Sequence, residues 1–231
     1  MDKAKENRRI WELDFLRGIA LILMIYFHVV YDMNEFFGYR IAYGSGINYF
    51  IGKASVILFI LISGISCSLS RSNFKRGLKL LGIALLVSLL SYLYNPEFVI
   101  KFGVIHFFAV CMLFYHLLNK LNNILLLLAG TGIIALGAYT SGLQASNDYL
   151  FPFGVTSPDF SSSDYYSLVP WMGLFLYGMF LSRVLYKKKT SLFPFRIDDT
   201  VINFLGRHTL VAYLIHQPVI IGVLSVIKQI N

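Results

Sequence analysis

The sequence predicts an all-α protein, a polytopic transmembrane helical bundle with about seven spans. Apolar residue types make up 57% of its 231 residues and charged residues only 14%, whereas an average globular domain has roughly 25% charged residues. The mean hydropathy is +0.66, so too few polar side chains are present to cover a water-facing surface. The apolar residues also occur in runs close to the 17–25 or so residues that a spanning helix needs. Soluble enzyme folds are therefore excluded.

Seven apolar runs are expected to form the spans. The first and third runs are short, so six spans with a re-entrant segment remain an alternative. Only Cys67 and Cys111 are present, both inside apolar runs, which excludes a disulfide-stapled secreted domain and predicts two buried hydrophobic residues. In chain order the runs are Leu13–Tyr31, Ala54–Ser70, Leu80–Asn95, Phe102–Asn119, Leu121–Asn147, Tyr165–Ser182 and Thr209–Ile227.

The amino-terminal region resembles a signal peptide, because basic residues precede an apolar stretch. Asp14 and Arg17 interrupt that stretch, however, and no small-residue cleavage site follows Tyr31. We therefore expect residues 1–12 to form a cytoplasmic segment and residues 13–229 to form a single transmembrane domain.

The distribution of positive charge predicts the orientation of the spans. With a cytoplasmic amino terminus and an extracytoplasmic carboxyl terminus, fifteen of the Lys and Arg residues fall inside, including Arg71, Lys75 and Arg76. The longest outer loop, about Ser141–Ser167, contains three Asp residues and no Lys or Arg. The net charge of +8 is thus a sign of topology and of contact with membrane lipid, and no nucleic acid partner is expected.

Ionisable residues inside spans cost roughly 2.5–3.5 kcal/mol each and indicate functional sites. Asp14 and Arg17 lie three residues apart on one helix face, near the predicted cytoplasmic end of the first span. Either they form a local ion pair, or Asp14 holds Arg17 for a phosphate-bearing ligand, which a guanidinium binds well. The basic loop with Arg71, Lys75 and Arg76 has the same two interpretations: a topology signal, or a phosphate-binding rim.

Three histidines are expected at similar depth in three different spans. His28 lies eleven residues beyond Arg17, about 16 Å along a helix axis, while His106 and His216 lie within the fourth and last runs. Each could be a core histidine with one satisfied hydrogen bond, or together they could bind a metal, relay protons or assist acyl transfer. No metal is expected, because no HxxH, HExxH or Cys/His motif is present. His116 and His208 lie near predicted helix ends and are weak candidates.

Five strings together resemble a known family of membrane acyltransferases. The family is the one named for the catalytic domain of heparan-alpha-glucosaminide N-acetyltransferase, and acyltransferase family 3 is related to it. The five strings cover most of the chain in family order, and the last is the most specific. They are Trp11–Ala20 followed by His28, Phe59–Gly64, Phe102–Phe107, Pro170–Gly178 and Leu205–Pro218.

The resemblance implies a helical bundle that takes an acyl group from cytoplasmic acyl-CoA. The acceptor is an amino or hydroxyl group of a sugar presented from the other side. His28 matches the essential histidine of acyltransferase family 3, and Arg17 and the Arg76 region match its basic positions. One departure concerns the loop after the first span: the glucosamine acetyltransferases have a further histidine there, and Val29–Lys53 contains none.

The sequence therefore predicts an integral membrane acyltransferase that uses acetyl-CoA and has a sugar or envelope glycan as acceptor. We expect His28, His106 and His216 in the catalytic centre. Residues Asp14, Arg17, Arg71, Lys75 and Arg76 are expected to bind acetyl-CoA. The alternative is a small transporter that uses its buried histidines for proton coupling. A homo-oligomer is compatible with either.

Overall fold

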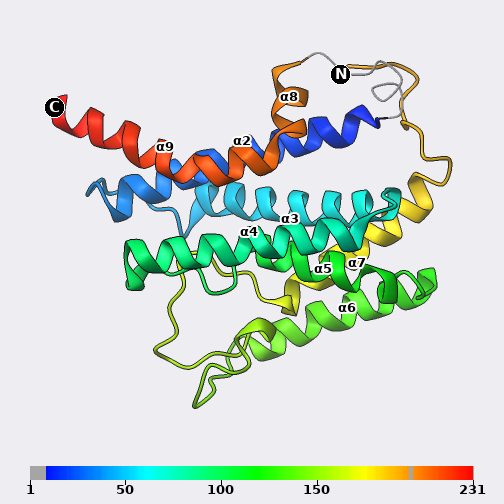
Figure 1. The fold of residues 1–231 in the computed structure, drawn as a ribbon, viewed down its shortest axis with the longest axis horizontal. Helices are drawn as coiled ribbons and strands as arrows, with labels where there is room; N and C mark the ends of the chain where they lie inside the picture. The colour runs from blue at the N-terminus through cyan, green and yellow to red at the C-terminus, as the bar shows by residue number, and fades with distance from the viewer. Residues whose placement is uncertain (1–8, 198–199, 231) are drawn as a thin grey trace. The chain divides into compact units, whose positions relative to one another are not determined.

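A computed structural model of the protein describes residues 9–197 and 200–230 (Figure 1). All regular elements in these ranges are helices, which confirms the predicted all-α class. Two 3-10 turns, η1 (Pro96–Phe98) and η2 (Phe151–Phe153), lie in the connecting segments. The α-helices are α2 (Trp11–Glu35), α3 (Gly46–Leu69), α4 (Asn73–Tyr94), α5 (Val104–Leu118), α6 (Asn123–Thr140), α7 (Leu168–Leu185), α8 (Val201–Arg207) and α9 (Thr209–Ile230).

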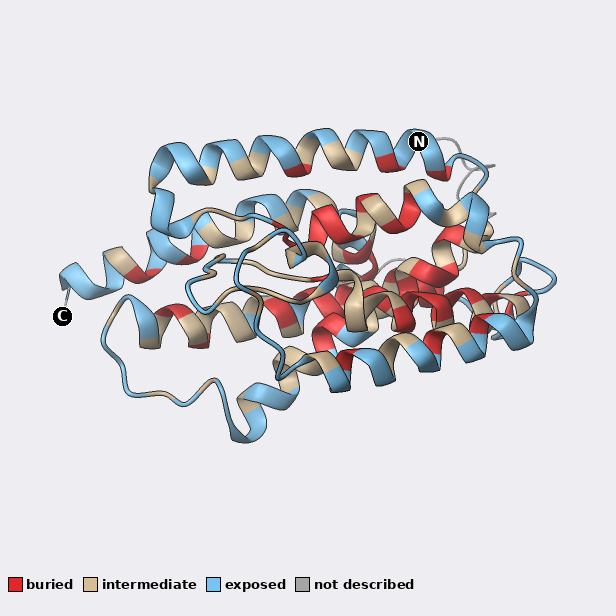
Figure 2. Ribbon diagram, turned by 90° about the horizontal axis from the view of Figure 1, so that it is seen from below, coloured by how far each residue is buried: buried red, intermediate tan, exposed pale blue. Residues whose placement is uncertain are grey.

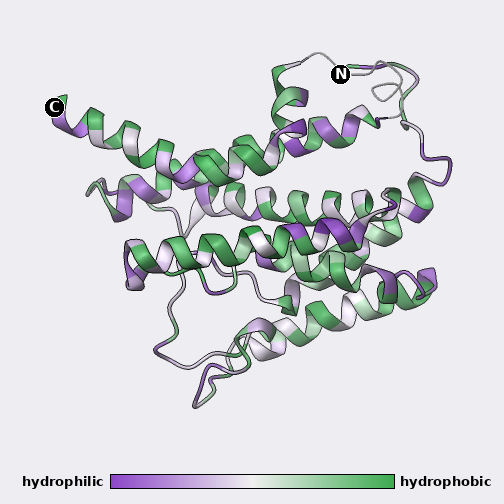
Figure 3. Ribbon diagram, viewed as in Figure 1, coloured by the Kyte–Doolittle hydropathy of each residue, from purple (hydrophilic) through white to green (hydrophobic). Residues whose placement is uncertain are grey.

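Six of these helices (α2, α3, α4, α6, α7 and α9) are long and apolar enough to cross a membrane, and α5 is a shorter apolar helix. In Figure 3 the helices are mostly hydrophobic and much of the hydrophilic colour lies in loops and near helix ends. All seven predicted runs are therefore helical, and the chain is a multi-pass membrane protein. The first and third runs were expected to be short, but their helices α2 and α4 have 25 and 22 residues. The short helix is instead α5, with 15 residues.

The chain divides into two compact units. Unit 1 consists of residues Met1–Ile62 and Lys188–Asn231, and unit 2 of Ser63–Lys187. Helix α3 is continuous through the boundary between Ile62 and Ser63. Figure 2 shows that many helices carry buried residues on one face and exposed residues on the other.

In unit 1, α8 packs directly on the backbone of the first half of α2. A methyl group added at Gly206 would overlap the carbonyl oxygen of Asp14, and one added at Gly18 would overlap that of Ile202. Such close approach requires small residues, as in other membrane helix pairs. On another face of α2, the hydroxyl of Ser55 in α3 donates to the carbonyl of Ala20 at 2.8 Å.

The segment that leads into α8 is also attached to α2. The indole N–H of Trp11 donates to the carbonyl of Phe195 at 3.0 Å, and the backbone N–H of Leu192 donates to Oε1 of Glu12 at 2.8 Å. Trp11 also packs against the rings of Phe193 and Phe195. The first turn of α2 thereby holds the start of the carboxyl-terminal part of unit 1.

In unit 2, α5 is the most buried helix, with Phe107, Ala109 and Cys111 fully enclosed. Cys67 is also fully enclosed and both cysteines are free thiols, which confirms the prediction that they act as buried hydrophobic residues. At about 22 Å, α5 is shorter than the roughly 30 Å hydrocarbon core of a bilayer. Its burial explains how so short an apolar helix is accommodated.

Two polar side chains close the ends of α5. The carboxylate of Asp164 accepts from the backbone N–H of Val104 at 2.9 Å, at the beginning of the helix. At its other end, the guanidinium of Arg183 in α7 donates to the carbonyls of Leu121 and Asn119 at 2.6 and 2.8 Å. Arg183 thus pairs with two backbone carbonyls in the turn that follows α5.

We predict that labelling of single introduced cysteines will report the orientation given by the positive charges. Ser162→Cys should react with an impermeant thiol reagent from outside, and Lys188→Cys only from the cytoplasmic side. The native cysteines are both buried and should give little background. Reaction of both variants from one side would contradict the topology.

We also predict that Gly206→Ala lowers the stability of the protein in detergent by about 1–3 kcal/mol, because the added methyl group forces α8 away from α2. The matched control is Gly222→Ala in α9, where an added methyl group meets nothing within 4 Å. The control should leave the thermal midpoint unchanged or slightly raised. Equal midpoints for the two variants would mean that the α2–α8 contact does not support the fold.

Candidate functional site

One stripe along α2 carries Asp14 and His28, two of the three polar residues predicted in the first span. The stripe runs through Asp14, Gly18, Leu21, His28 and Asp32. Successive members are three, four or seven residues apart, so they share one face of the helix. α8 covers the first half of this stripe through Gly18. α9 contacts the second half through His216 and Gln217.

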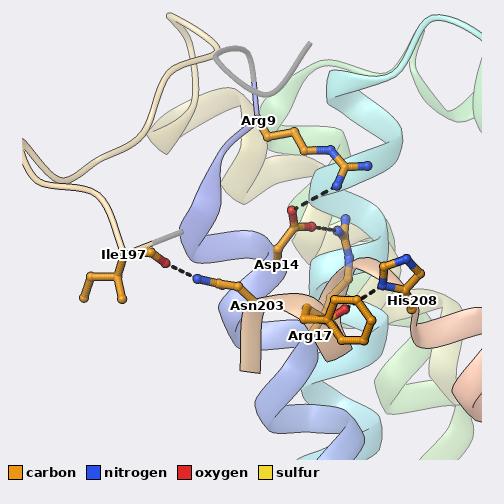
Figure 4. Close-up of polar contacts among 7 residues, drawn as sticks. Arg9, Asp14, Arg17, Ile197, Asn203 and His208 are labelled. Atoms are coloured by element: carbon orange, nitrogen blue, oxygen red, sulfur yellow. Dashed lines mark hydrogen bonds and ion pairs between the residues drawn. The ribbon is translucent and has the colours of Figure 1, made fainter. Parts of the chain in front are cut away.

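At the first half, Asp14 and Arg17 form the ion pair that their spacing predicts. Nη1 of Arg17 donates to Oδ1 of Asp14 at 2.6 Å, and Arg9 lies 3.8 Å from the other carboxylate oxygen (Figure 4). The Arg17 side chain is 26% exposed and that of Asp14 12% exposed. The carboxylate thus orients a partly exposed guanidinium.

At the second half, the structure brings His28 and His216 together. Their ring centroids lie 4.7 Å apart with an interplanar angle of 62°. Nδ1 of His216 lies 2.5 Å from the carbonyl oxygen of Tyr213, which can only accept, so Nδ1 carries a proton. In the neutral ring Nε2 of His216 is therefore the nitrogen with the free electron pair.

One helical turn beyond His28, Asp32 meets the neighbour of His216. Nε2 of Gln217 donates to both carboxylate oxygens of Asp32, at 2.8 and 2.9 Å. Asp32 is completely buried. The four side chains form two adjacent pairs between α2 and α9, and we call them the α2–α9 polar cluster: His28, Asp32, His216 and Gln217.

Three atoms of the α2–α9 polar cluster are buried without a hydrogen-bond partner among the described residues: Nδ1 of His28, Nε2 of His216 and Oε1 of Gln217. Buried polar atoms are paired in about 90% of cases or more, so unpaired ones require an explanation. Three of them on neighbouring residues of one helix pair are typical of a site that receives polar groups from a ligand.

His106 lies in unit 2 and has partners for both ring nitrogens. The backbone N–H of Gly103 donates to Nδ1 at 3.2 Å, so Nε2 carries the proton and points to the hydroxyl of Ser88 at 3.1 Å. That hydroxyl donates in turn to the carbonyl of Ile100 at 2.5 Å. In these contacts His106 acts as a cap at the beginning of α5, and its predicted catalytic role stays a prediction.

The other predicted residues have simpler surroundings. Arg71 precedes α4, and Lys75 and Arg76 lie in its first turn; all three are exposed, as binding of CoA phosphates requires. Nδ1 of His208 lies 2.9 Å from the carbonyl oxygen of Phe204, within unit 1. His116 is exposed near the end of α5. No group of three His, Cys, Asp or Glu residues that could hold a metal is present in the described part of the chain.

Sequence reasoning missed Asp32 and Gln217. Asp32 lies just past the apolar run that ends at Tyr31, and Gln217 is uncharged, so a search for charges within runs finds neither. A signal was present nonetheless. Asp32 follows His28 by four residues, which places both on one helix face, and Gln217 directly follows His216 within the last family-like string.

The comparisons with known proteins point to one family. The profile of the family described as heparan-alpha-glucosaminide N-acetyltransferase, catalytic, matches residues 9–218. Searches of curated proteins and of solved structures each find no match. The matched segment covers nearly all of the described helices and contains the whole α2–α9 polar cluster. The chain belongs to the family of the heparan-alpha-glucosaminide N-acetyltransferase catalytic domain, a family of membrane acetyltransferases.

Proposed function

We propose that the protein transfers an acetyl group from cytoplasmic acetyl-CoA to an amino or hydroxyl group of a sugar or envelope glycan. The observation that carries the proposal is the pair of half-buried imidazoles of His28 and His216. Their ring centroids lie 4.7 Å apart, and each ring has one buried nitrogen without a hydrogen-bond partner among the described residues. Family membership supports the reaction class, and the imidazole pair supplies the chemistry that the reaction needs.

The imidazole pair is suited to act as a general base. The acceptor presents an N–H or O–H group, and its nitrogen or oxygen attacks the thioester carbonyl carbon. As this bond forms, Nε2 of His216 or Nδ1 of His28 takes the proton, and the carbon–sulfur bond breaks. The CoA thiolate leaves with the electron pair and then receives the proton. A thioester is already activated, so positioning and one imidazole supply most of what is needed.

The two rings also have an electrostatic consequence. Two imidazolium ions at 4.7 Å would repel strongly in a site shielded from water. The pair therefore holds one additional proton at a time, which suits a single proton transfer per turnover. Transient acetylation of His28 is the second chemical route and uses the same residues.

Acetyl-CoA would be bound through its phosphates. The guanidinium of Arg17, oriented by Asp14, is the proposed phosphate ligand in unit 1. For unit 2 by itself, the basic residues Arg71, Lys75 and Arg76 are proposed as phosphate ligands from the sequence. All are partly or fully exposed basic groups, and Arg in particular binds phosphate through two parallel hydrogen bonds. Among the described residues, no carboxylate lies within ion-pair distance of Arg71, Lys75 or Arg76.

A proton-coupled transporter would also use buried histidines, but the resemblance to acetyltransferases extends through residues 9–218. The two classes are distinguished by turnover of acetyl-CoA. A transporter leaves the thioester intact, whereas the proposed enzyme releases free CoA thiol when an acceptor is present.

We predict that Arg17→Ala weakens CoA binding by about 1.5–3 kcal/mol, the value of a hydrogen bond to a charged group. Arg17→Lys should lose less, because it keeps the charge but not the two-pronged guanidinium. Calorimetric titration of the purified protein with CoA measures both. Unchanged affinity in Arg17→Ala would return Arg17 to a purely structural ion pair with Asp14.

We predict that His28→Gln and His216→Gln each lower acetyl transfer by about 10²–10⁴-fold, since neither amide can exchange a proton near neutral pH. CoA binding should persist in both variants. The matched control is His116→Gln, which changes an exposed histidine outside the α2–α9 polar cluster and should retain the wild-type rate. A rate within about threefold of wild type in both cluster variants would rule out the proposed base.

A further inference from the structure

The carboxylate of Asp32 is buried, and none of the described residues places a cationic side chain within ion-pair distance of it. Its exposed fraction is 0%, and its hydrogen bonds come from the neutral amide of Gln217. The ion pairs among the described residues both involve Asp14. Burial of a carboxylate costs several kcal/mol unless a positive charge or further hydrogen bonds offset it. A positive charge that forms beside the carboxylate would offset this cost.

The positive charge that the proposed reaction creates lies one helical turn away. Asp32 follows His28 by four residues, so the two side chains are neighbours on α2, with Cβ atoms about 5–6 Å apart. Gln217, which holds the carboxylate, directly follows His216. The same two helices thus present the imidazole pair and, next to it, a fixed negative charge.

We propose that Asp32 is the counter-charge for the imidazolium that forms on the His28–His216 pair during acetyl transfer, and that Gln217 holds Asp32 in position. The inference rests on the proposed function and adds a positioning residue to the same site. The proton moves from the acceptor's N–H or O–H group to an imidazole nitrogen, and from there to the departing thiolate. Between these two transfers the imidazolium faces the carboxylate of Asp32, and the electron pair of the reaction resides on the tetrahedral oxyanion and then on the departing thiolate.

Gln217 determines where the carboxylate points. Because one amide nitrogen bonds to both oxygens of Asp32, the carboxylate group points toward Gln217 in α9, the residue next to His216. An amide has no charge, so it orients Asp32 without cancelling the negative charge. A Lys or Arg at position 217 would form a permanent ion pair and would remove the electrostatic effect on the histidines.

Other titratable groups near this end of unit 1 have contacts of their own. Glu35 accepts from the hydroxyl of Tyr43 at 2.9 Å, and this bond is the main cause that raises the pKa of Tyr43. The ammonium groups of Lys53 in α3 and Lys228 in α9 lie over the rings of Tyr49 and Phe37. Asp32 therefore differs from these groups in being both buried and adjacent to the imidazole pair. The remaining titratable groups on α2, the loop after it and α9 are Glu12, Asp14, Arg17, Tyr26, His28, Tyr31, Tyr39, Arg40, Tyr213 and His216.

The test is the pH dependence of acetyl transfer in the full-length protein, with acetyl-CoA as donor and glucosamine as acceptor probe. In Asp32→Asn the imidazolium loses its counter-charge and forms less readily. The acidic limb of the rate profile should then move to lower pH by about one unit or more, while the plateau rate falls because the base is weaker. Asp32→Glu keeps the charge and should keep the limb within a few tenths of a unit.

Glu35→Gln is the matched control. It removes one negative charge from the same end of α2, at an exposed position, where solvent screens it, and should leave the limb in place. Asp32→Ser is the second charge-removing variant, in which a smaller hydroxyl group still accepts from Gln217. Retained CoA binding shows which variants are folded.

A merely structural Asp32 would lower the rate equally at all pH values, and an unmoved limb in a folded Asp32→Asn or Asp32→Ser variant overturns the inference. Equal displacement in Asp32→Glu would overturn it too, because the cause would then be shape and not charge. The proposed function fails by a different result: absence of histidine-dependent transfer in the wild-type protein. The two failures are therefore distinguishable.

Discussion

The direct packing of α8 on the backbone of α2 is the contact on which the arrangement of unit 1 depends. Gly206 rests on the carbonyl of Asp14 and Gly18 on that of Ile202, so the two helices approach more closely than larger side chains would permit. His208 is the only residue between α8 and α9. The close packing of α8 on α2 therefore determines where α9 begins. The start of α9 in turn determines how His216 and Gln217 contact the second half of the α2 stripe.

The same stripe separates two kinds of polar chemistry along one helix. Asp14 and Arg17, at one end, expose a guanidinium held by a carboxylate. At the other end His28 and Asp32 lie against α9, and the hydrogen bonds of the fully buried Asp32 are strengthened by its shielding from water. The proposed donor has phosphates and needs a cationic group, whereas the acceptor has an N–H or O–H group and needs a base. The two groups lie on different parts of α2.

The helices could be predicted from the sequence because a bilayer imposes a length and an apolar composition on each span. The ends were less predictable. α2 begins at Trp11 and α4 at Asn73, before the apolar runs that predicted them. A helix can continue through polar residues at the membrane surface, and such residues lie outside the apolar run. The pairing of helices was not readable from composition at all. His28 and His216 were expected at similar depth, but only the packing of α9 on α2 shows that they are neighbours and that Asp32 meets Gln217.

The hydrogen bonds between Asp32 and Gln217 join residues 185 positions apart in the chain. During synthesis at about 5–20 residues per second, the first helix therefore waits on the order of 10–40 s before its partner exists. For that time α2 lacks the partners of two carboxylates: Asp32 has not met Gln217 of α9, and Glu12 has not met the backbone N–H of Leu192 in the segment before α8. The nascent first helix is thus the stage at which this protein depends most on insertion machinery or on water at the membrane surface.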